Sequence, residues 1–357
     1  MWNYGLFGGT AAALALVITP PVRWLALRLG AVDEPGGRRA HRGRVPRLGG
    51  LAVLLAGLGG LLLPWAGGVP VFAELIGRGW SLGWFLAGML VVTALGIFDD
   101  CRNVGPLPKL VFETLAAIIA LAGGVGFVAI SNPFTGGSIE IGPLGGVLSV
   151  LWIVGITNAF NLIDGLDGLA AGVALIASAT IFVIAGVQTR PDAAVLAAVL
   201  AGALLGFLRY NFCPASIFLG DSGSLLLGYV LSVLSIQGQQ KGPTVVVLLV
   251  PILVLGFPIV ETLVTVARRY GRGGSASLFD ADREHIHHRL VMRGMAQRRA
   301  VLLLYGVSGG LGLLAVLAVV VGGPGSAALV LVAAVAGYLG LRRLGYTFVR
   351  GGAATHD

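Results

Sequence analysis

The sequence predicts an all-α membrane protein forming a single integral membrane domain over residues 1–357, and three observations support this. Of its residues, 56% are hydrophobic and only 11% are charged, whereas soluble proteins carry about 25% charged residues. The apolar residues fall in eleven runs, each close to the roughly 20 residues that a bilayer-spanning helix needs. The 57 glycines are spread through these runs, as expected of closely packed membrane helices. This composition excludes a soluble globular enzyme, a disordered chain and a nucleic-acid-binding protein.

The eleven runs are interpreted as transmembrane helices. They cover residues 4–27, 49–66, 80–98, 109–130, 143–160, 168–187, 193–211, 222–238, 244–268, 300–322 and 325–343. The long basic segment 268–299 separates the ninth run from the tenth. In the first run the basic residues Arg23 and Arg28 follow the apolar residues, whereas a signal peptide carries its positive charge before them. The first run is therefore predicted to be a retained helix.

The charged residues predict an orientation. Basic residues in loops mark the cytoplasmic side of a membrane protein. With the N-terminus outside, all but three of the 24 basic residues fall on cytoplasmic segments or helix ends. The C-terminus is then cytoplasmic, the number of helices is odd, and the net charge of +8 is mainly an orientation signal. Most acidic residues fall on the same side, and five of them end apolar helices, which predicts an active site at the cytoplasmic face.

Two adjacent carboxylates, Asp99 and Asp100, end the third run, and Lys109 follows across a loop with one glycine and two prolines. Carboxylates at this depth cost several kcal/mol unless they are paired or bind a cation. A nearby ammonium group supplies a compact positive charge to a phosphate. A solvated loop pair is the alternative for this motif taken alone.

A second motif, TNAFNLIDGLDGLAAG, spaces Asn158, Asn161, Asp164 and Asp167 three residues apart. On an unbroken helix the first and last of these would face opposite ways. The glycines at 165 and 168 are expected to break the helix, which lets the polar groups converge and turns backbone N–H groups toward a ligand. Capping between two helices explains one such residue but not four.

Two further motifs complete the set. In FLGDSGS, Asp221 is either a helix N-cap or a site carboxylate, and Phe218 is either a core residue or a face for stacking a base. In HIHHRL, three of the five histidines of the chain, with Arg289, offer donors to phosphate and sugar oxygens, and the spacing does not suit a zinc site. The three histidines are His285, His287 and His288.

Three weaker signals remain. Arg39 and His41 lie in a basic loop after the first run, which either only sets the topology or also lines the same cytoplasmic mouth. Glu113 and Glu261 lie inside apolar runs, where an acid is a functional candidate, although Glu113 lies one helical turn from Lys109 and can pair with it. Proton-carrying glutamates would suit a proton-coupled transporter, the alternative from another functional class. The sequence has no internal repeat that supports this alternative.

At these motifs the sequence closely resembles the polyprenyl-phosphate N-acetylhexosamine-1-phosphate transferases, over nearly the whole chain. HIHHRL is similar to the bacterial undecaprenyl-phosphate GlcNAc-1-phosphate branch, whereas relatives that transfer phospho-MurNAc-pentapeptide have three consecutive histidines there. The resemblance implies transfer of GlcNAc-1-phosphate from UDP-GlcNAc to undecaprenyl phosphate, with UMP released, as the first step of a cell-envelope glycan. UDP-GalNAc and UDP-MurNAc-pentapeptide remain alternative donors. It also implies a multi-pass protein of the bacterial inner membrane, with membrane lipids around it and a homodimer as the candidate assembly.

The resemblance also implies roles for residues, with Mg²⁺ as cofactor and Mn²⁺ as its substitute. The metal ligands are Asn161 and Asp221. The catalytic residues are Asp99, Asp100, Lys109 and Asp164. The substrate-binding residues include Asp167 and Phe218 at the uracil and the HIHHRL residues around the pyrophosphate and sugar, and the full set is Asn158, Asp167, Phe218, His285, His287, His288, Arg289, Arg39 and His41.

The charges of the two substrates favour a cation and positive side chains at the site, independently of the resemblance. A lipid phosphate and a nucleotide pyrophosphate repel each other, and a divalent cation with positive groups offsets this repulsion. A phosphate monoester, with a second pKa of about 6, is already mostly dianionic at neutral pH, so a general base adds little. We therefore expect Asp99 or Asp100 to position the metal or Lys109 while the lipid phosphate attacks directly. A base role and a covalent aspartyl intermediate stay open.

Overall fold

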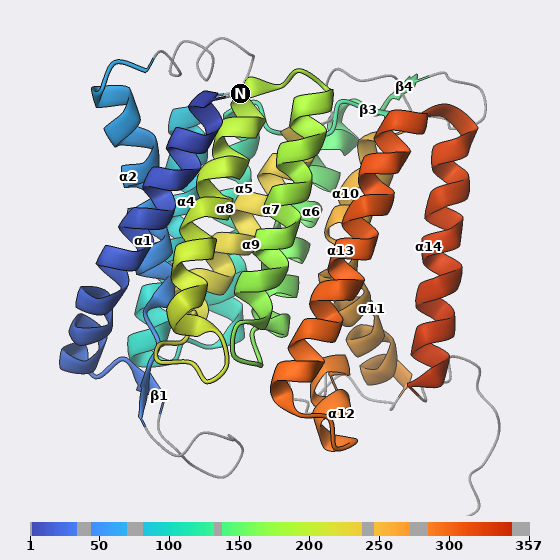
Figure 1. Cartoon of the computed structure of the whole chain (residues 1–357). Coiled ribbons are helices and arrows are strands. Elements are labelled where there is room, and N and C mark those ends of the chain that lie inside the picture. The colour runs from blue at the N-terminus through green and yellow to red at the C-terminus, as the bar shows by residue number, and fades with distance from the viewer. Residues whose placement is uncertain are drawn as a thin grey trace, which may run out of the picture.

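The computed structural model describes residues 2–33, 44–69, 81–131, 138–237, 246–271 and 285–344. Figure 1 shows a bundle of long, roughly parallel and antiparallel helices. The helices are α1 (Trp2–Leu29), α2 (Gly49–Ala66), α4 (Leu82–Arg102), α5 (Pro106–Ala122), α6 (Pro143–Ile163), α7 (Leu169–Val187), α8 (Pro191–Asn211), α9 (Gly220–Gln237), α10 (Val246–Val254), α11 (Gly256–Gly271), α12 (Ile286–Met292), α13 (Gln297–Val321) and α14 (Gly323–Arg343). Two short antiparallel hairpins accompany them, formed by β1 (Val32–Asp33) with β2 (Val45–Pro46) and by β3 (Ala129–Ser131) with β4 (Ser138–Glu140).

The bundle confirms the predicted all-α, multi-pass membrane architecture. Within the described ranges, eight helices are long and apolar enough to cross a membrane, namely α1, α2, α4, α6, α7, α8, α13 and α14. Each coincides with one of the eleven predicted runs. The count of eleven crossings and the orientation of the termini stay predictions.

The remaining predicted runs depart from simple spanning helices. The run 109–130 is helical only to Ala122, and Ala129–Ser131 forms β3 instead. The run 244–268 contains two helices, α10 and α11, which meet at Leu255. Pro258 has no N–H to donate to the carbonyl of Val254, so the helical hydrogen-bond pattern is interrupted there. The predicted boundaries were wrong at these points because hydropathy records apolar character and not hydrogen bonding.

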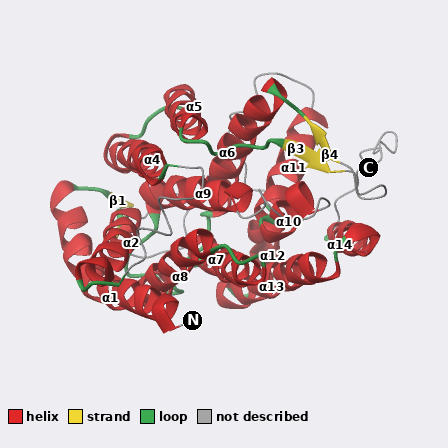
Figure 2. Ribbon diagram, turned by 90° about the horizontal axis from the view of Figure 1, so that it is seen from above, coloured by secondary structure: helices red, strands yellow, loops and turns green. Residues whose placement is uncertain are grey.

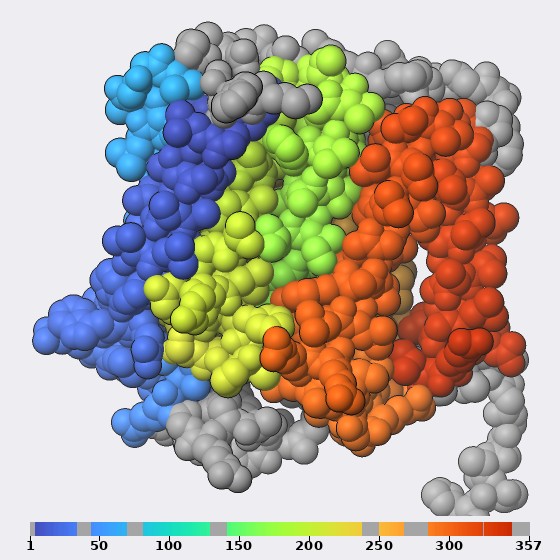
Figure 3. All heavy atoms as spheres, viewed as in Figure 1, coloured from blue at the N-terminus to red at the C-terminus, as the bar shows by residue number. Residues whose placement is uncertain are grey.

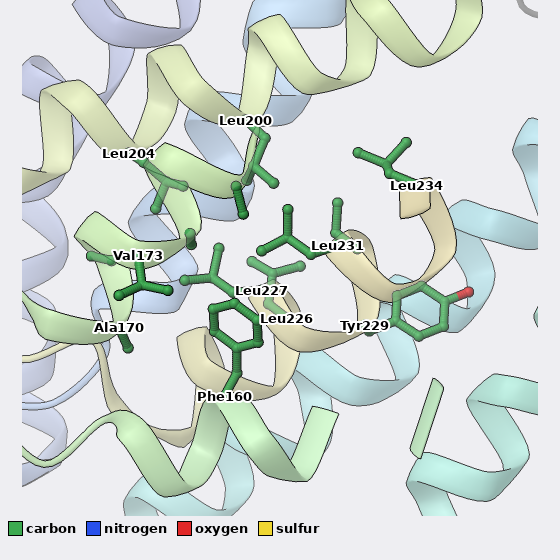
Figure 4. Packing of buried hydrophobic residues seen from close by; sticks show 14 of the residues in the cluster. Phe160, Ala170, Val173, Leu200, Leu204, Leu226, Leu227, Tyr229, Leu231 and Leu234 are labelled. Carbon is green, nitrogen blue, oxygen red and sulfur yellow. The ribbon is translucent and has the colours of Figure 1, made fainter. Parts of the chain in front are cut away.

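Helix α9 forms the centre of the molecule. Every residue of α9 except Asp221 is buried, and in the view from above the helix lies inside a ring of other helices (Figure 2). Figure 4 shows Leu226, Leu227 and Leu231 of α9 packed among side chains of α6, α7 and α8. A helix that is apolar on all sides suits this fully enclosed position.

Glycines let the first turn of α9 approach its neighbours closely. A Cβ at Gly50 of α2 would overlap the backbone of Ser222 and Gly223, and a Cβ at Gly96 of α4 would overlap the backbone of Asp221 and Ser222. Backbone, unlike the end of a flexible side chain, cannot move aside cheaply. The small residues of α2 and α4 therefore determine where the start of α9 lies.

Replacing Gly50 with alanine is expected to lower the thermal unfolding midpoint in detergent. Overpacking a tight contact costs typically about 1–3 kcal/mol, which outweighs the higher helix propensity of alanine. Gly57→Ala is the matched control on α2, because the nearest atom to its new Cβ would be Val199 Cγ1 at 3.9 Å. An equal midpoint for the two variants would contradict the close approach of α2 to α9.

Helices α13 and α14 form the margin of the bundle. Tyr305 of α13 lies over Gly172 of α7, where a Cβ would overlap the tyrosine ring. Helix α14 packs against α13 and α10, and Figure 3 shows its lower half standing apart from α13. At the same lower end of Figure 1 lie β1, the α6–α7 and α8–α9 connections and α12. We call this the α12 end, and it carries the polar motifs.

Candidate active site at the α12 end

A cluster of charged side chains joins three helices at the α12 end. Asp99 lies in the last turn of α4, Lys109 in the first turn of α5 and Asp221 in the first turn of α9. Lys109 Nζ lies 2.7 Å from Asp99 Oδ2 and also pairs with Asp221 Oδ2. The lysine ammonium thus bridges two carboxylates that lie 122 positions apart in the sequence.

The two adjacent aspartates make different contacts. Asp99 accepts a hydrogen bond from the backbone N–H of Val104 and pairs with Lys109. Asp100 accepts from the backbone N–H of Asp221 at 2.9 Å and of Ser222 at 3.1 Å, one with each carboxylate oxygen. Negative charge is stabilised at a helix N-terminus. Asp99 therefore orients Lys109, and Asp100 holds the start of α9.

The segment before α2 brings an arginine to the same cluster. Phe218 N donates to Pro46 O at 2.8 Å, and Gly49 N donates to Phe218 O at 3.0 Å. Between these bonds, Arg47 places Nε 3.8 Å from Asp100 Oδ1 and Nη2 3.9 Å from Asp221 Oδ1. Sequence reasoning missed Arg47, although its position two residues before a pair of glycines that start a helix was an available signal.

Gly220 makes this junction possible. Its φ of +72° is in the region that favours glycine, and an added Cβ would overlap the carbonyl of Arg47 and the carboxylate of Asp100. The glycine before Asp221 thus allows the chain to turn into α9 directly beside Asp100. Asp221 is the second residue of α9, so the N-cap interpretation of this residue was wrong.

The polar residues at the end of α6 extend the cluster. Asn158 donates to Glu113 Oε2 of α5, and Asn161 Nδ2 donates to Ser224 Oγ of α9 at 3.0 Å. Glu113 therefore pairs with Asn158, where the sequence suggested Lys109. The helix ends at Ile163, and Asp164 follows it as the C-cap. The predicted break is confirmed there.

The surroundings of Asp164 shift the pKa of its carboxyl group. Partial burial, followed by the carboxylates of Asp221 and Asp100, raises the pKa of Asp164 to about 8. The guanidinium of Arg47 acts in the opposite direction. The charged cluster thus has four carboxylates and the two positive groups of Lys109 and Arg47, and a further positive charge would offset the repulsion among the carboxylates. The carboxylates are those of Asp99, Asp100, Asp164 and Asp221.

The α6–α7 connection is attached to its neighbours at three points. Asp167 Oδ2 accepts from the backbone N–H of Ala215 at 2.9 Å, which joins the connection to the loop that carries Phe218. Gly168 has a φ of +77° and its carbonyl accepts from Tyr305 Oη of α13. Gly165 lies against the ring of His287. The predicted uracil contacts of Asp167 and Phe218 stay predictions.

The histidine motif lies at the start of α12. His285 is its N-cap residue, and the His285 and His287 rings stack at 5.4 Å with an interplanar angle of 4°. The His288 ring centroid lies 4.4 Å from that of His287. Burial, together with the neighbouring histidines, holds the pKa of His287 well below its usual range. His287 is therefore neutral at neutral pH, and neither ring nitrogen has a hydrogen-bond partner among the described residues.

Arg289 contacts another part of the chain. Its Nη1 donates to Leu344 O at 3.0 Å, and Arg293 Nη2 donates to the same carbonyl at 3.1 Å. Leu344 is the C-cap residue of α14, where positive groups are favoured by the helix dipole. These contacts attach α12 to the end of α14, and a pyrophosphate contact of Arg289 stays a prediction. Arg39 and His41 lie outside the described residues.

Comparisons with known proteins show the family of the chain. Residues 82–239 match the family model described as glycosyl transferase family 4. The chain is 40% identical over 290 residues to a Bacillus subtilis protein described as a probable undecaprenyl-phosphate N-acetylglucosaminyl 1-phosphate transferase, covering 81% of the chain and 78% of the relative. The chain belongs to the polyprenyl-phosphate hexosamine-1-phosphate transferase family. It is thus a multi-pass membrane enzyme, a sugar-phosphate transferase, and the transporter alternative is not supported.

Two other relatives show the range of this transferase family. A decaprenyl-phosphate N-acetylglucosaminephosphotransferase of Mycobacterium tuberculosis is 36% identical over 321 residues, with 84% of the chain and 78% of the relative covered. A phospho-N-acetylmuramoyl-pentapeptide-transferase of Listeria monocytogenes is 31% identical over 297 residues, with 79% and 86% covered. The relatives are thus all named as transferases of a sugar phosphate, and their names differ in the sugar.

The oxygen ligands that this transferase offers fit a magnesium ion that is also bound by water and substrate. Among the described residues, no three His, Cys, Asp or Glu side chains form a metal-binding group. Mg²⁺, however, is usually bound by one or two carboxylates together with water and substrate phosphates. Asp221 offers carboxylate oxygens, and Asn161 uses its Nδ2 toward Ser224, which leaves its amide oxygen for a cation. The residues therefore fit a site completed by substrate.

Replacing Gly165 with alanine is expected to lower the transferase activity about 100-fold, because a shift of about 1 Å near reacting groups can have such an effect. The new Cβ would overlap the buried His287 ring, so the α6–α7 connection or α12 would move. Gly155→Ala on α6 is the control, since its Cβ would have no atom within 4 Å. Steady-state kinetics of both variants test this, and equal activity would contradict the contact.

Proposed function

We propose that the chain transfers GlcNAc-1-phosphate from UDP-GlcNAc to undecaprenyl phosphate at the cytoplasmic face of the bacterial inner membrane, and that the reaction requires Mg²⁺. The observation that carries the proposal is the Lys109 ammonium bridging Asp99 and Asp221, with Arg47 beside Asp100. These positive groups lie at the ends of helices, where a membrane-spanning bundle would meet the interface. That position is suited to a reaction between a water-soluble pyrophosphate and the phosphate of a membrane lipid.

The charged residues support direct displacement. Asp99 keeps the Lys109 ammonium in place, and Asp100 holds the N-terminus of α9, whose backbone dipole favours negative charge. Lys109 and Arg47 then offset the charge of two phosphate groups as they approach. The lipid phosphate oxygen attacks the β-phosphorus of the donor, a new P–O bond forms, and the bond to UMP breaks. No enzyme carboxylate needs to remove a proton from a dianionic phosphate.

Asp221 and Asn161 are the residues that would hold Mg²⁺, with Mn²⁺ as a substitute. The ion would supply positive charge to the donor pyrophosphate. Burial is the main cause of the raised pKa of Asp164, and the carboxylates of Asp221 and Asp100 add to it; a cation would offset the repulsion among these carboxylates. Asp164 itself would assist in binding the metal or its water.

Removing divalent cations is expected to abolish transfer, and Mg²⁺ or Mn²⁺ is expected to restore it. Asp221→Asn is expected to raise the Mg²⁺ concentration for half-maximal activity at least about tenfold, since even the loss of an outer partner of a metal ligand has an effect of this size. Activity is measured as product formed against free Mg²⁺. Full activity in excess chelator would contradict the metal requirement.

The identity of the sugar is supported by the relatives. The Bacillus and Mycobacterium proteins, at 40% and 36% identity, are named for GlcNAc phosphate, and the 31% identical Listeria protein for phospho-MurNAc-pentapeptide. The decisive experiment supplies purified protein with Mg²⁺, undecaprenyl phosphate and one radiolabelled UDP-sugar at a time. UDP-GlcNAc is expected to yield lipid-linked product and UMP. Preference for UDP-GalNAc or UDP-MurNAc-pentapeptide would overturn the assignment of the sugar. The absence of product from every one of these donors would overturn the proposed reaction.

A further inference from the structure

A buried acid on α11 reaches the histidine motif from outside the charged cluster. The side chain of Glu261 has no exposed surface. Its Oε1 lies 3.0 Å from His285 Nδ1 and accepts from the backbone N–H of Ile286 at 2.9 Å. Glu261 therefore holds both the first backbone N–H of α12 and the ring of the residue that precedes this helix.

The contacts around His285 determine which ring nitrogen carries the hydrogen. Thr265 Oγ1 donates to the carbonyl of Glu261 at 2.8 Å, so it faces His285 Nδ1, 3.3 Å away, with a lone pair. Glu261 Oε1 likewise acts as an acceptor toward Ile286. Two acceptors thus flank Nδ1, which must be the protonated nitrogen. Nε2 remains for a partner outside this contact, as in other sites where a second residue selects the histidine tautomer.

The His285 ring is connected to the α6–α7 connection through its neighbour. It is stacked on His287, and His287 lies against Gly165. A rotation of His285 would therefore disturb a contact that adjoins Asp164. Glu261 lies on α11, which carries no member of the charged cluster. The sequence alone did not indicate that Glu261 contacts His285.

We propose that Glu261 is a positioning residue of this transferase, which holds His285 in the Nδ1–H form and directs Nε2 toward the sugar-phosphate part of the nucleotide donor. The inference rests on the proposed function. Glu261 acts through His285 and through the N–H of Ile286 at the start of α12, and it touches neither substrate. The intramembrane acid that suggested proton transport is thus part of the transferase site.

The test compares two substitutions of Glu261, which separate hydrogen bonding from packing, with one control substitution. Glu261→Gln keeps an acceptor oxygen, Glu261→Met keeps the volume without an acceptor, and Thr262→Val is the control on α11, since Thr262 Oγ1 donates to the carbonyl of Pro258 in its own helix. Glu261→Met is expected to lower kcat/KM roughly 10- to 100-fold, as for the loss of a hydrogen bond to a charged group. Glu261→Gln is expected to retain most of the activity, and Thr262→Val all of it.

A double-mutant cycle and a spectroscopic measurement complete the test. In a His285→Ala background, Glu261→Met is expected to have a smaller effect on kcat/KM than in the wild type, because only the bond to the N–H of Ile286 is then left to lose. In ¹⁵N-histidine spectra, the His285 signal, assigned by its loss in His285→Ala, is expected to show the Nδ1–H form in the wild type and to change in Glu261→Met.

Two kinetic results would overturn the positioning role. One is an equal loss of activity for Glu261→Gln and Glu261→Met that follows their thermal unfolding midpoints, and the other is a loss from Glu261→Met in the His285→Ala background as large as that in the wild type. A wild-type protein inactive with every UDP-sugar would overturn the proposed function alone, because the ¹⁵N spectra still report the His285 form. An unchanged spectrum in Glu261→Met would overturn the inference while leaving the function intact.

Discussion

Lys109→Met is expected to lower kcat/KM about 1000-fold while the protein still folds and inserts. The ammonium of Lys109 is the group between Asp99 and Asp221, so its loss leaves two facing carboxylates where two phosphates must bind. Removal of one donor that stabilises charge in a transition state lowers the rate by about 10² to 10³. The added repulsion between the carboxylates and the substrate phosphates places the expected effect at the upper end of this range. Initial rates of UMP release at varied UDP-GlcNAc measure it.

The control for Lys109→Met is Arg102→Met. Arg102 is an exposed basic residue in the last turn of α4, close to Asp99 in the sequence. Its replacement removes the same formal charge from the α12 end and is expected to leave kcat/KM nearly unchanged. Equal losses for the two variants would mean that Lys109 contributes only to the general field of the surface, which would contradict a specific contact with phosphate.

Asp100→Asn is expected to lower activity about 100-fold or more at every pH. Asp100 accepts two backbone N–H groups, those of Asp221 and Ser222. An asparagine can accept only one, because its NH₂ group would face the other donor. An unsatisfied buried donor costs about 1–3 kcal/mol, and the start of α9 with Asp221 would move to avoid it. The rate is measured from neutral to alkaline pH with donor binding measured separately.

The pH dependence distinguishes positioning from base catalysis. If Asp100 positions α9, the variant stays impaired as the pH rises, because a deprotonated substrate does not restore the position of Asp221. Recovery of activity at alkaline pH with unchanged donor binding would mean that Asp100 removes a proton, and the positioning role would be wrong. Gly155→Ala, which changes α6 without a new contact, serves as the reference for expression and folding.

Much of the architecture follows from the sequence because a bilayer imposes strong constraints. Spanning helices need about 20 apolar residues and satisfy their own backbone hydrogen bonds, so most runs coincide with helices. The central position of α9 does not follow, because a run that is apolar on all sides is equally compatible with lipid on every side. The short α5 and the division at Leu255 also escape hydropathy, since they depend on glycines and prolines.

The members of the site were easier to predict than the contacts between them. Asp99, Lys109 and Asp221 are acids and a base at the ends of apolar runs, which is unusual enough to identify them. The separate contacts of Asp99 and Asp100 depend on the Asn103–Gly105 loop and on the start of α9, which no spacing reveals. Arg47 and Glu261 reach the site through tertiary packing, and their partners lie far away in the sequence.

A cryo-EM structure of the protein in nanodiscs with UDP-GlcNAc and Mg²⁺ tests the central claim most directly. Pyrophosphate density is expected beside Lys109 Nζ and the first turn of α9, at the α12 end, with the sugar toward His285. Nucleotide bound at the opposite end of the bundle, or a pyrophosphate that contacts neither Lys109 nor the start of α9, would contradict it.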